Sequence, residues 1–155
     1  HFADVAPETW ALMYDVNVTG PFHVIQAALP SLLERRGNVV NVGSVAGLRG
    51  MPYQAGYGSS KAALIHLTKS LAVEYATRGV RVNAVCPGTV RTPLVEGVAA
   101  AMPRDLEPAL LGRMQGVVPG IIEPGEIAEA ILYAASDDAR SMTGHALTVD
   151  LGVIC

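Results

Sequence analysis

The apolar residues of the chain recur at spacings that predict helices. From about Pro7 to about Arg35 they return every three or four residues, the period of a helix with one apolar face: Trp10, Tyr14, Val18, Phe22, Ile25, Leu29 and Leu32. A second helix is predicted from Tyr57 to Arg78, and Gly79 is the residue expected to end it. A third is predicted from Pro124 to about Ser136.

Three short runs of apolar residues, two of them rich in valine, alternate with these helices and predict strands. They cover Asn38 to Val42, Val80 to Cys86, and Ala146 to Val149. Residues 92–120 are punctuated by proline and glycine and are expected to have some helical content. Strands that alternate with helices predict an α/β fold, in which a parallel sheet carries helices on both faces.

Composition indicates a soluble intracellular chain with a sizeable core. Half of the 155 residues are hydrophobic, 16% are charged, and the formal net charge is −3. Without a basic cluster, we expect no binding to nucleic acid or to an anionic membrane. We expect no signal peptide, and the sequence contains no apolar run of the ~20 residues that a membrane span needs, so a cytoplasmic location is expected. The two cysteines form no disulfide framework, and the four histidines have no metal-binding spacing.

A tyrosine and a lysine at positions i and i+4 are the most informative chemical feature. Tyr57 and Lys61 share one face of the predicted helix, about 6 Å apart along its axis. A phenol titrates near ~10, and an ammonium one turn away is expected to favour the phenolate and make proton transfer useful. Ser44 adds a hydroxyl that can donate to a substrate oxygen. Together, these groups suit proton exchange with an alcohol or a carbonyl.

The predicted topology brings these groups to one edge of the sheet. In open α/β sheets, ligands bind outside the carboxyl ends of the strands. Ser44 follows the first strand and Pro87-Gly88 follows the second, so both are expected near the start of the helix that carries Tyr57. At Gly88 the backbone is expected to approach a ligand closely or to take an unusual turn.

Pro21 marks an irregular point in the first helix. Because proline has no N–H, the carbonyl of Asn17, four residues earlier, loses its helical partner. A freed carbonyl binds water or a ligand, or belongs to a merely kinked helix. Both interpretations are open from the residues alone.

With its surroundings, this pattern resembles the short-chain dehydrogenase/reductase family. The resemblance implies the C-terminal part of a doubly wound parallel-sheet Rossmann fold, with residues 1–155 as the catalytic part of one domain and the first βαβαβ half expected before residue 1. Leu151 stands where the family commonly has a glycine. The segments that carry the resemblance, in family order, are Trp10…Val16-Asn17-Val18-Thr19-Gly20-Pro21-Phe22, Asn38-Val39-Val40-Asn41-Val42-Gly43-Ser44, Tyr57-x-x-x-Lys61, residues 80–92, and Thr143-Gly144…Val149-Asp150.

The resemblance implies reversible hydride transfer between a nicotinamide cofactor, NAD or NADP, and a carbonyl or secondary alcohol. Tyr57 would exchange the proton and Ser44 would polarise the substrate oxygen. Lys61 would lower the pKa of the tyrosine and hold the nicotinamide ribose, while Asn17 would anchor a water of the proton relay. Four residues would contact the nicotinamide end of the cofactor: Pro87, Gly88, Val90 and Thr92.

The resemblance also bears on partners. The first helix and the helix from Tyr57 to Arg78 match those that pair across a twofold axis in the family, so a homodimer or homotetramer is expected. Eight apolar residues between the second and third strands are expected to form either a lid over an apolar substrate or ordinary helix packing: Leu94, Val95, Val98, Met102, Leu106, Leu110, Leu111 and Met114.

Two classes of function are compatible with the sequence. The chain is expected to be part of a reductase, alone or completed by a second polypeptide. The alternative is a non-enzymatic or partner-dependent fragment that acts as an oligomerisation or interaction module. The first is favoured because a scaffold has no use for Asn17, Ser44, Tyr57 and Lys61 at catalytic spacing.

Overall fold

Three parallel strands form the sheet of the computed structural model, which describes residues 1–103 and 105–155. The strands are β1 (Asn38–Val42), β2 (Arg81–Pro87) and β3 (Ala146–Val149), and they lie in the order β1-β2-β3. The predicted bounds of β1 and β3 are confirmed, and β2 begins and ends one residue later than predicted. The predicted α/β fold with a parallel sheet is confirmed.

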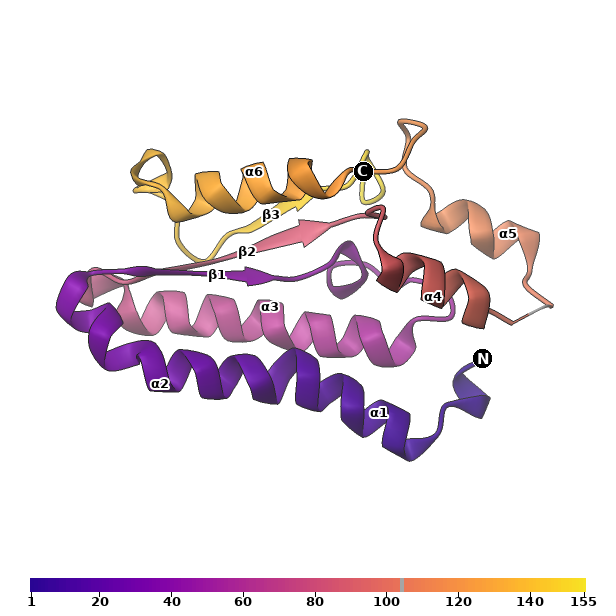
Figure 1. The fold of residues 1–155 in the computed structure, drawn as a ribbon, viewed down its shortest axis with the longest axis horizontal. Helices are drawn as coiled ribbons and strands as arrows, with labels where there is room; N and C mark the ends of the chain where they lie inside the picture. Colours follow the sequence, from indigo (N-terminus) through magenta and orange to yellow (C-terminus); the bar gives the residue numbers. More distant parts are fainter. Residues whose placement is uncertain (104) are drawn as a thin grey trace.

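Helices cover both faces of this sheet, as Figure 1 shows. On one side lie α1 (Pro7–Tyr14), α2 (Gly20–Arg35) and α3 (Ala55–Tyr75), and on the other lies α6 (Pro124–Ala135). The segment predicted to be partly helical contains α4 (Pro93–Ala101) and α5 (Pro108–Leu111), which extend beyond the carboxyl ends of the strands. No helix formed by the described residues combines the length and apolar character that a membrane crossing requires.

The core lies on both faces of β2, because successive side chains of a strand point to opposite sides. Val85 packs toward α6, in a buried cluster with Ile122 and Ile127. Its neighbours Ala84 and Cys86 point the other way and pack with Ile65 of α3. As the central strand, β2 is buried along nearly its whole length, and it sets the positions of the helices on both sides.

The first predicted helix has an interruption that its sequence explains. A π-helical segment, Asp15–Thr19, separates α1 from α2. Pro21 offers no N–H to the carbonyl of Asn17, and the N–H of Gly20 donates to the carbonyl of Asp15, five residues back. The predicted continuous helix from Pro7 to Arg35 is therefore corrected to two α-helices joined by a wider turn.

Residues with a left-handed backbone conformation follow α3 and β3. Gly79, the predicted stop, has φ of 83° and follows a short 3₁₀ turn, Ala76–Arg78, after α3. Leu151, two residues after the end of β3, has φ of 55°. This conformation costs a leucine more than a glycine, so a glycine would adopt it with less strain.

A close contact between α3 and the turn after β1 places the site. This turn is a short 3₁₀ segment, Val45–Gly47. A Cβ added at Gly47 would lie 2.7 Å from the carbonyl carbon of Lys61 and 2.8 Å from the nitrogen of Ala62. A Cβ at Gly58 would lie 2.8 Å from the carbonyl oxygen of Ala46. Two glycines, one on each side, therefore let the two backbones approach.

We predict that Gly47→Ala destabilises the protein by about 1–3 kcal/mol, the usual effect of overpacking, because the added methyl meets backbone that cannot rotate away. Urea unfolding measures this change in the free energy of unfolding. Gly50→Ala is the matched control, since a Cβ at Gly50 meets nothing within 4 Å. Equal unfolding midpoints for the two variants would contradict the proposed close contact.

Candidate functional site

Two cavities meet at the carboxyl ends of the strands. The larger has a volume of about 720 Å³ and the smaller about 320 Å³. Five residues line both of them: Ser44, Tyr57, Gly88, Leu94 and Val95. The hydroxyl groups of Ser44 and Tyr57 therefore belong to a wall that the two cavities share.

Ser44 is held in this wall by backbone contacts on either side. The N–H of Gly43 donates to the carbonyl of Val85 at 2.7 Å, which extends the pairing of β1 with β2 by one residue. The Ser44 oxygen accepts a hydrogen bond from the N–H of Ala46 at 3.1 Å and caps the Val45–Gly47 turn. Because this contact uses the hydroxyl only as an acceptor, its proton is available to another group.

Tyr57 lies near the start of α3, and burial has the largest effect on the pKa of its phenol. Burial raises the pKa of Tyr57 above its ordinary value, because an ionised phenol loses solvation there. The nearby Ser44 hydroxyl, as a hydrogen-bond partner of the phenol, acts in the opposite direction and lowers this pKa. The structure thus corrects the expectation that Lys61 would dominate and depress the pKa of Tyr57.

The placement of Lys61 explains this correction. Its ammonium lies 5.8 Å from the centre of the Tyr57 ring and donates a hydrogen bond to the carbonyl of Val42 at 2.8 Å. Burial lowers the pKa of Lys61 itself. Lys61 lines the smaller cavity, so its charge faces the space beside the tyrosine.

Asn17 contacts the site from behind and lines neither cavity. Its side-chain amide donates to the hydroxyl of Ser60 at 3.0 Å, and that hydroxyl donates to the carbonyl of Tyr57 at 2.8 Å. The π-helical segment that carries Asn17 is thereby joined to the turn of α3 that carries Tyr57. Sequence reasoning missed Ser60, which is fully buried; its spacing of i+3 from Tyr57 was the available signal.

The residues predicted to contact a cofactor gather in the smaller cavity. Pro87, Gly88, Val90 and Thr92 line it together with Lys61. The segment around Val90 is held by Ile122, whose carbonyl accepts from the N–H of Arg91 at 2.9 Å. The Thr92 hydroxyl lies at the start of α4 and accepts from the N–H of Val95 at 3.4 Å.

Gly88 allows two segments of the chain to approach each other closely. Its φ is not in the left-handed region, so the unusual turn is not found, and a Cβ there would lie 2.9 Å from the Cα of Asp150. This approach to the chain that follows β3 keeps the ends of β2 and β3 together. The approach of Gly88 to a ligand stays a prediction, and Gly88 lines both cavities.

The apolar residues between β2 and β3, expected to form either a lid or ordinary helix packing, contribute to the wall of the larger cavity. Six of these eight apolar residues line the cavity, namely Leu94, Val95, Val98, Met102, Leu110 and Met114. Leu106 and Leu111 do not. Helices α4 and α5 thus cover an open space beside Ser44 and Tyr57, which favours the lid over ordinary packing.

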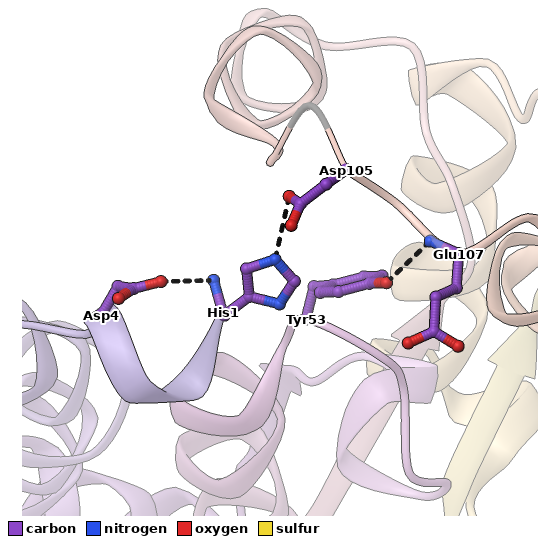
Figure 2. A network of polar contacts seen from close by, with 5 residues as sticks. All are labelled: His1, Asp4, Tyr53, Asp105 and Glu107. Carbon is purple, nitrogen blue, oxygen red and sulfur yellow. Dashed lines mark hydrogen bonds and ion pairs between the residues drawn. The ribbon is translucent and has the colours of Figure 1, made fainter.

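Contacts at the mouth of this cavity join three distant segments, as Figure 2 shows. The ring of His1 lies 3.0 Å from a carboxylate oxygen of Asp105 and packs edge-on against Tyr53, with ring centres 5.4 Å apart. The Tyr53 hydroxyl accepts from the N–H of Glu107 at 3.1 Å. Tyr53 has φ of 62°, an unfavourable value for an aromatic residue. Sequence reasoning missed this cluster, because only folding brings its members together.

Comparison with known proteins shows which family and which relatives the chain is similar to. Residues 1–154 match the family model described as Enoyl-(Acyl carrier protein) reductase. The 2-(S)-hydroxypropyl-CoM dehydrogenase 3 of Xanthobacter autotrophicus is 43% identical over 157 residues, which cover 99% of this chain and 60% of the relative. The inactive 2-(S)-hydroxypropyl-CoM dehydrogenase 2 of the same organism is 42% identical over 149 residues, which cover 94% of this chain and 64% of the relative.

Solved structures agree with this result. A short chain dehydrogenase from Mycobacterium paratuberculosis bound to NAD matches with a TM-score of 0.88 and 32% identity, over 97% of this chain and 58% of that one. Other matching structures are complexes with NADH or with NADP. The chain spans about 60% of the length of curated relatives that it matches.

We predict that Tyr57 of the unliganded protein ionises above the ~10 of an ordinary tyrosine, since burial raises its pKa. The folded protein then holds this proton more tightly than the unfolded chain, so the contribution of Tyr57 to stability is lost as the pH rises through its raised pKa. The difference between ultraviolet titrations of the protein and of Tyr57→Phe isolates this phenol.

Ser44→Ala should move the ionisation of Tyr57 to still higher pH, because it removes the hydroxyl that lowers this pKa. Ser59→Ala is the control, since the Ser59 hydroxyl donates to the carbonyl of Ala55 in its own helix at 2.7 Å. An ionisation of Tyr57 below the ordinary value, or one insensitive to Ser44→Ala, would contradict this account of the site.

Proposed function

The chain belongs to the short-chain dehydrogenase/reductase family, and we propose that it carries the proton-transfer and substrate-binding groups of an enzyme that interconverts a carbonyl compound and a secondary alcohol. The wall that the two cavities share is the observation that carries this proposal. It allows one hydroxyl pair to act on a molecule in the larger cavity while the smaller cavity holds a second molecule. A redox reaction between two bound molecules requires such an arrangement.

Residues of the smaller cavity fit a nicotinamide cofactor, either NAD or NADP. Lys61 supplies an ammonium that suits ribose hydroxyls, and Thr92 supplies a hydroxyl that suits a carboxamide. Pro87, Gly88 and Val90 add a backbone edge beside them. When bound, this cofactor gives or takes a hydride; the groups that would distinguish NAD from NADP are not among these residues.

The two hydroxyl groups divide the remaining work. Ser44 donates its hydrogen bond to the oxygen of the carbonyl or alcohol and orients it, since its own acceptor capacity is partly used by the N–H of Ala46. Tyr57 gives a proton to that oxygen in reduction and takes it back in oxidation. Because burial raises its pKa, Tyr57 is a phenol at neutral pH and is ready to donate.

Lys61 and Asn17 support this exchange from the other side. The Lys61 ammonium lies near the Tyr57 ring and stabilises the phenolate that forms when the proton leaves. Asn17 acts through Ser60 as a positioning residue, because it fixes the turn of α3 from which Tyr57 projects. The relay water expected at Asn17 belongs to the same proposal, which is supported by the π-helical segment that carries Asn17.

The similarity of the chain to an inactive relative makes a test of the proposed activity necessary. At 42% identity this relative is almost as similar to the chain as the 43% identical dehydrogenase, so overall similarity does not decide activity. Activity is decided by the side chains on the shared wall and by what surrounds them. The proposed reaction therefore depends on proton transfer by the hydroxyl of Tyr57.

We predict that Tyr57→Phe lowers kcat at least ~10²-fold, the usual loss when a general acid–base group is removed. The enzyme is assayed with NAD and with NADP on a panel of ketones and secondary alcohols. Cofactor affinity should change little, because the ring remains.

Tyr133→Phe is the matched control. Tyr133 is 47% exposed on α6 and lines neither cavity, so the loss of its hydroxyl should leave kcat unchanged. Turnover by Tyr57→Phe close to that of the unaltered enzyme would remove Tyr57 from the mechanism and favour the alternative of an interaction module.

We also propose that the protein associates with itself through the helices on the α3 side of the sheet. Large apolar side chains are exposed there, including Leu12 (62%), Val24 (69%) and Val73 (82%). Exposed apolar surface of this kind marks interfaces, and closed twofold symmetry is the commonest solution. Light scattering should show a dimer or tetramer that Val24→Glu weakens; a stable monomer at micromolar concentration would contradict the proposal.

A further inference from the structure

The larger cavity has a lining that selects by polarity. Four of the five methionines of the chain line it: Met13, Met51, Met102 and Met114. Aliphatic side chains of α4 and α5 complete the wall opposite Ser44 and Tyr57. Methionine is apolar, flexible and polarisable, so a wall rich in it adapts to hydrocarbon groups of different shape.

The charges at the mouth of the cavity have one predominant sign. Asp105 and Glu107 stand there with carboxylates, and His1, which contacts Asp105, is the titratable group facing them (Figure 2). The amino group of His1 lies 3.7 Å from a carboxylate oxygen of Asp4. Among the described residues that line the cavity, none is a lysine or an arginine. An anionic ligand therefore meets carboxylates among the described residues beside the cavity, and no lysine or arginine side chain of the described lining to pair with.

The volume of the larger cavity agrees with its apolar lining. A volume of about 720 Å³ lies in the upper part of the range of small-molecule sites, roughly 300–1,000 Å³, and exceeds what a two- or three-carbon alcohol fills. Gln54 and Thr89 add polar side chains to its lining, and the hydroxyls of Ser44 and Tyr57 lie on the wall shared with the smaller cavity, where they suit one oxygen atom of a ligand. Most of the remaining lining is apolar.

We infer that the larger cavity takes a neutral, mainly hydrocarbon ketone or secondary alcohol, and that it discriminates against substrates carrying a carboxylate, sulfonate or phosphate. This inference rests on the proposed function, because it names the substrate class of the same site. The oxygen of the ligand lies at Ser44 and Tyr57, and its hydrocarbon part extends toward α4, α5 and the methionines.

The first measurement compares kcat/KM along a series of 2-alkanones and along ketones of matched length that end in a carboxylate or a sulfonate. For the alkanones, kcat/KM should rise about fourfold with each added methylene until the cavity is filled, as expected for burial of a CH₂ group. The anionic ketones should be at least ~10-fold poorer than alkanones of the same length.

A charge variant tests the wall directly. Val98→Arg places a cation in the lining at a position that is 44% exposed, so the fold should tolerate it. It should lower kcat/KM for the alkanones and raise it for the anionic ketones. Leu132→Arg is the matched control, since Leu132 is 69% exposed on α6 and lines neither cavity; it should leave both series unchanged.

Binding is measured independently of the reaction through Trp10, the single tryptophan of the chain. Its ring lies beside Gly56 of the cavity wall, where an added Cβ would be 3.3 Å from the ring and 3.0 Å from the sulfur of Met13. Titration with a 2-alkanone should change the fluorescence of Trp10, and Val98→Arg should weaken this response.

The outcomes separate the substrate class from the reaction. Turnover that favours the anionic ketones would overturn the substrate class and leave the proposed function intact. An absence of turnover, together with alkanone binding that Val98→Arg weakens, would uphold the ligand class and overturn the proposed reaction. Alkanones that are neither reduced nor bound would overturn the inference.

Discussion

The contact between the Val45–Gly47 turn and α3 is the constraint on which the site depends. Ser44 caps this turn, and Tyr57 and Lys61 project from the part of α3 that packs against it. Side chains larger than hydrogen at Gly47 and Gly58 would separate the two backbones, since contacts below 3 Å with backbone atoms require movement. Backbone packing therefore sets the relative positions of the two hydroxyl groups.

Burial has opposite consequences for the two ionisable groups of the site. It raises the pKa of Tyr57 and lowers that of Lys61, because both changes favour a neutral group in a poorly solvated place. The Ser44 hydroxyl moderates the effect on the phenol by lowering its pKa, and the carbonyl of Val42 accepts a hydrogen bond from the Lys61 ammonium. The proton of the phenol is thus held firmly until a ligand changes its surroundings.

The cavities on the two sides of the shared wall have linings of different chemistry, so each suits a different kind of molecule. The smaller cavity offers an ammonium, a hydroxyl and a backbone edge. The larger one offers methionine and aliphatic side chains, with carboxylates at its mouth. One side suits a polar molecule and the other an apolar one, and both reach Tyr57. Under the proposed function, residues of α4 and α5 select the substrate, while Tyr57 and Lys61 of α3 serve the proton transfer.

The sequence by itself determined the alternation of strands and helices, because periodic apolar positions and helix-ending residues such as Gly79 act over short distances. It also predicted that Ser44, Tyr57 and the segment after β2 would meet, since the carboxyl ends of parallel strands share one edge. Local rules did not reveal the role of Ser60, the packing role of Gly88 or the cluster of His1, Tyr53 and Asp105. These depend on contacts between residues far apart in the chain. The direction of the Tyr57 pKa shift was likewise decided by tertiary structure, because burial exists only once the surrounding elements have packed.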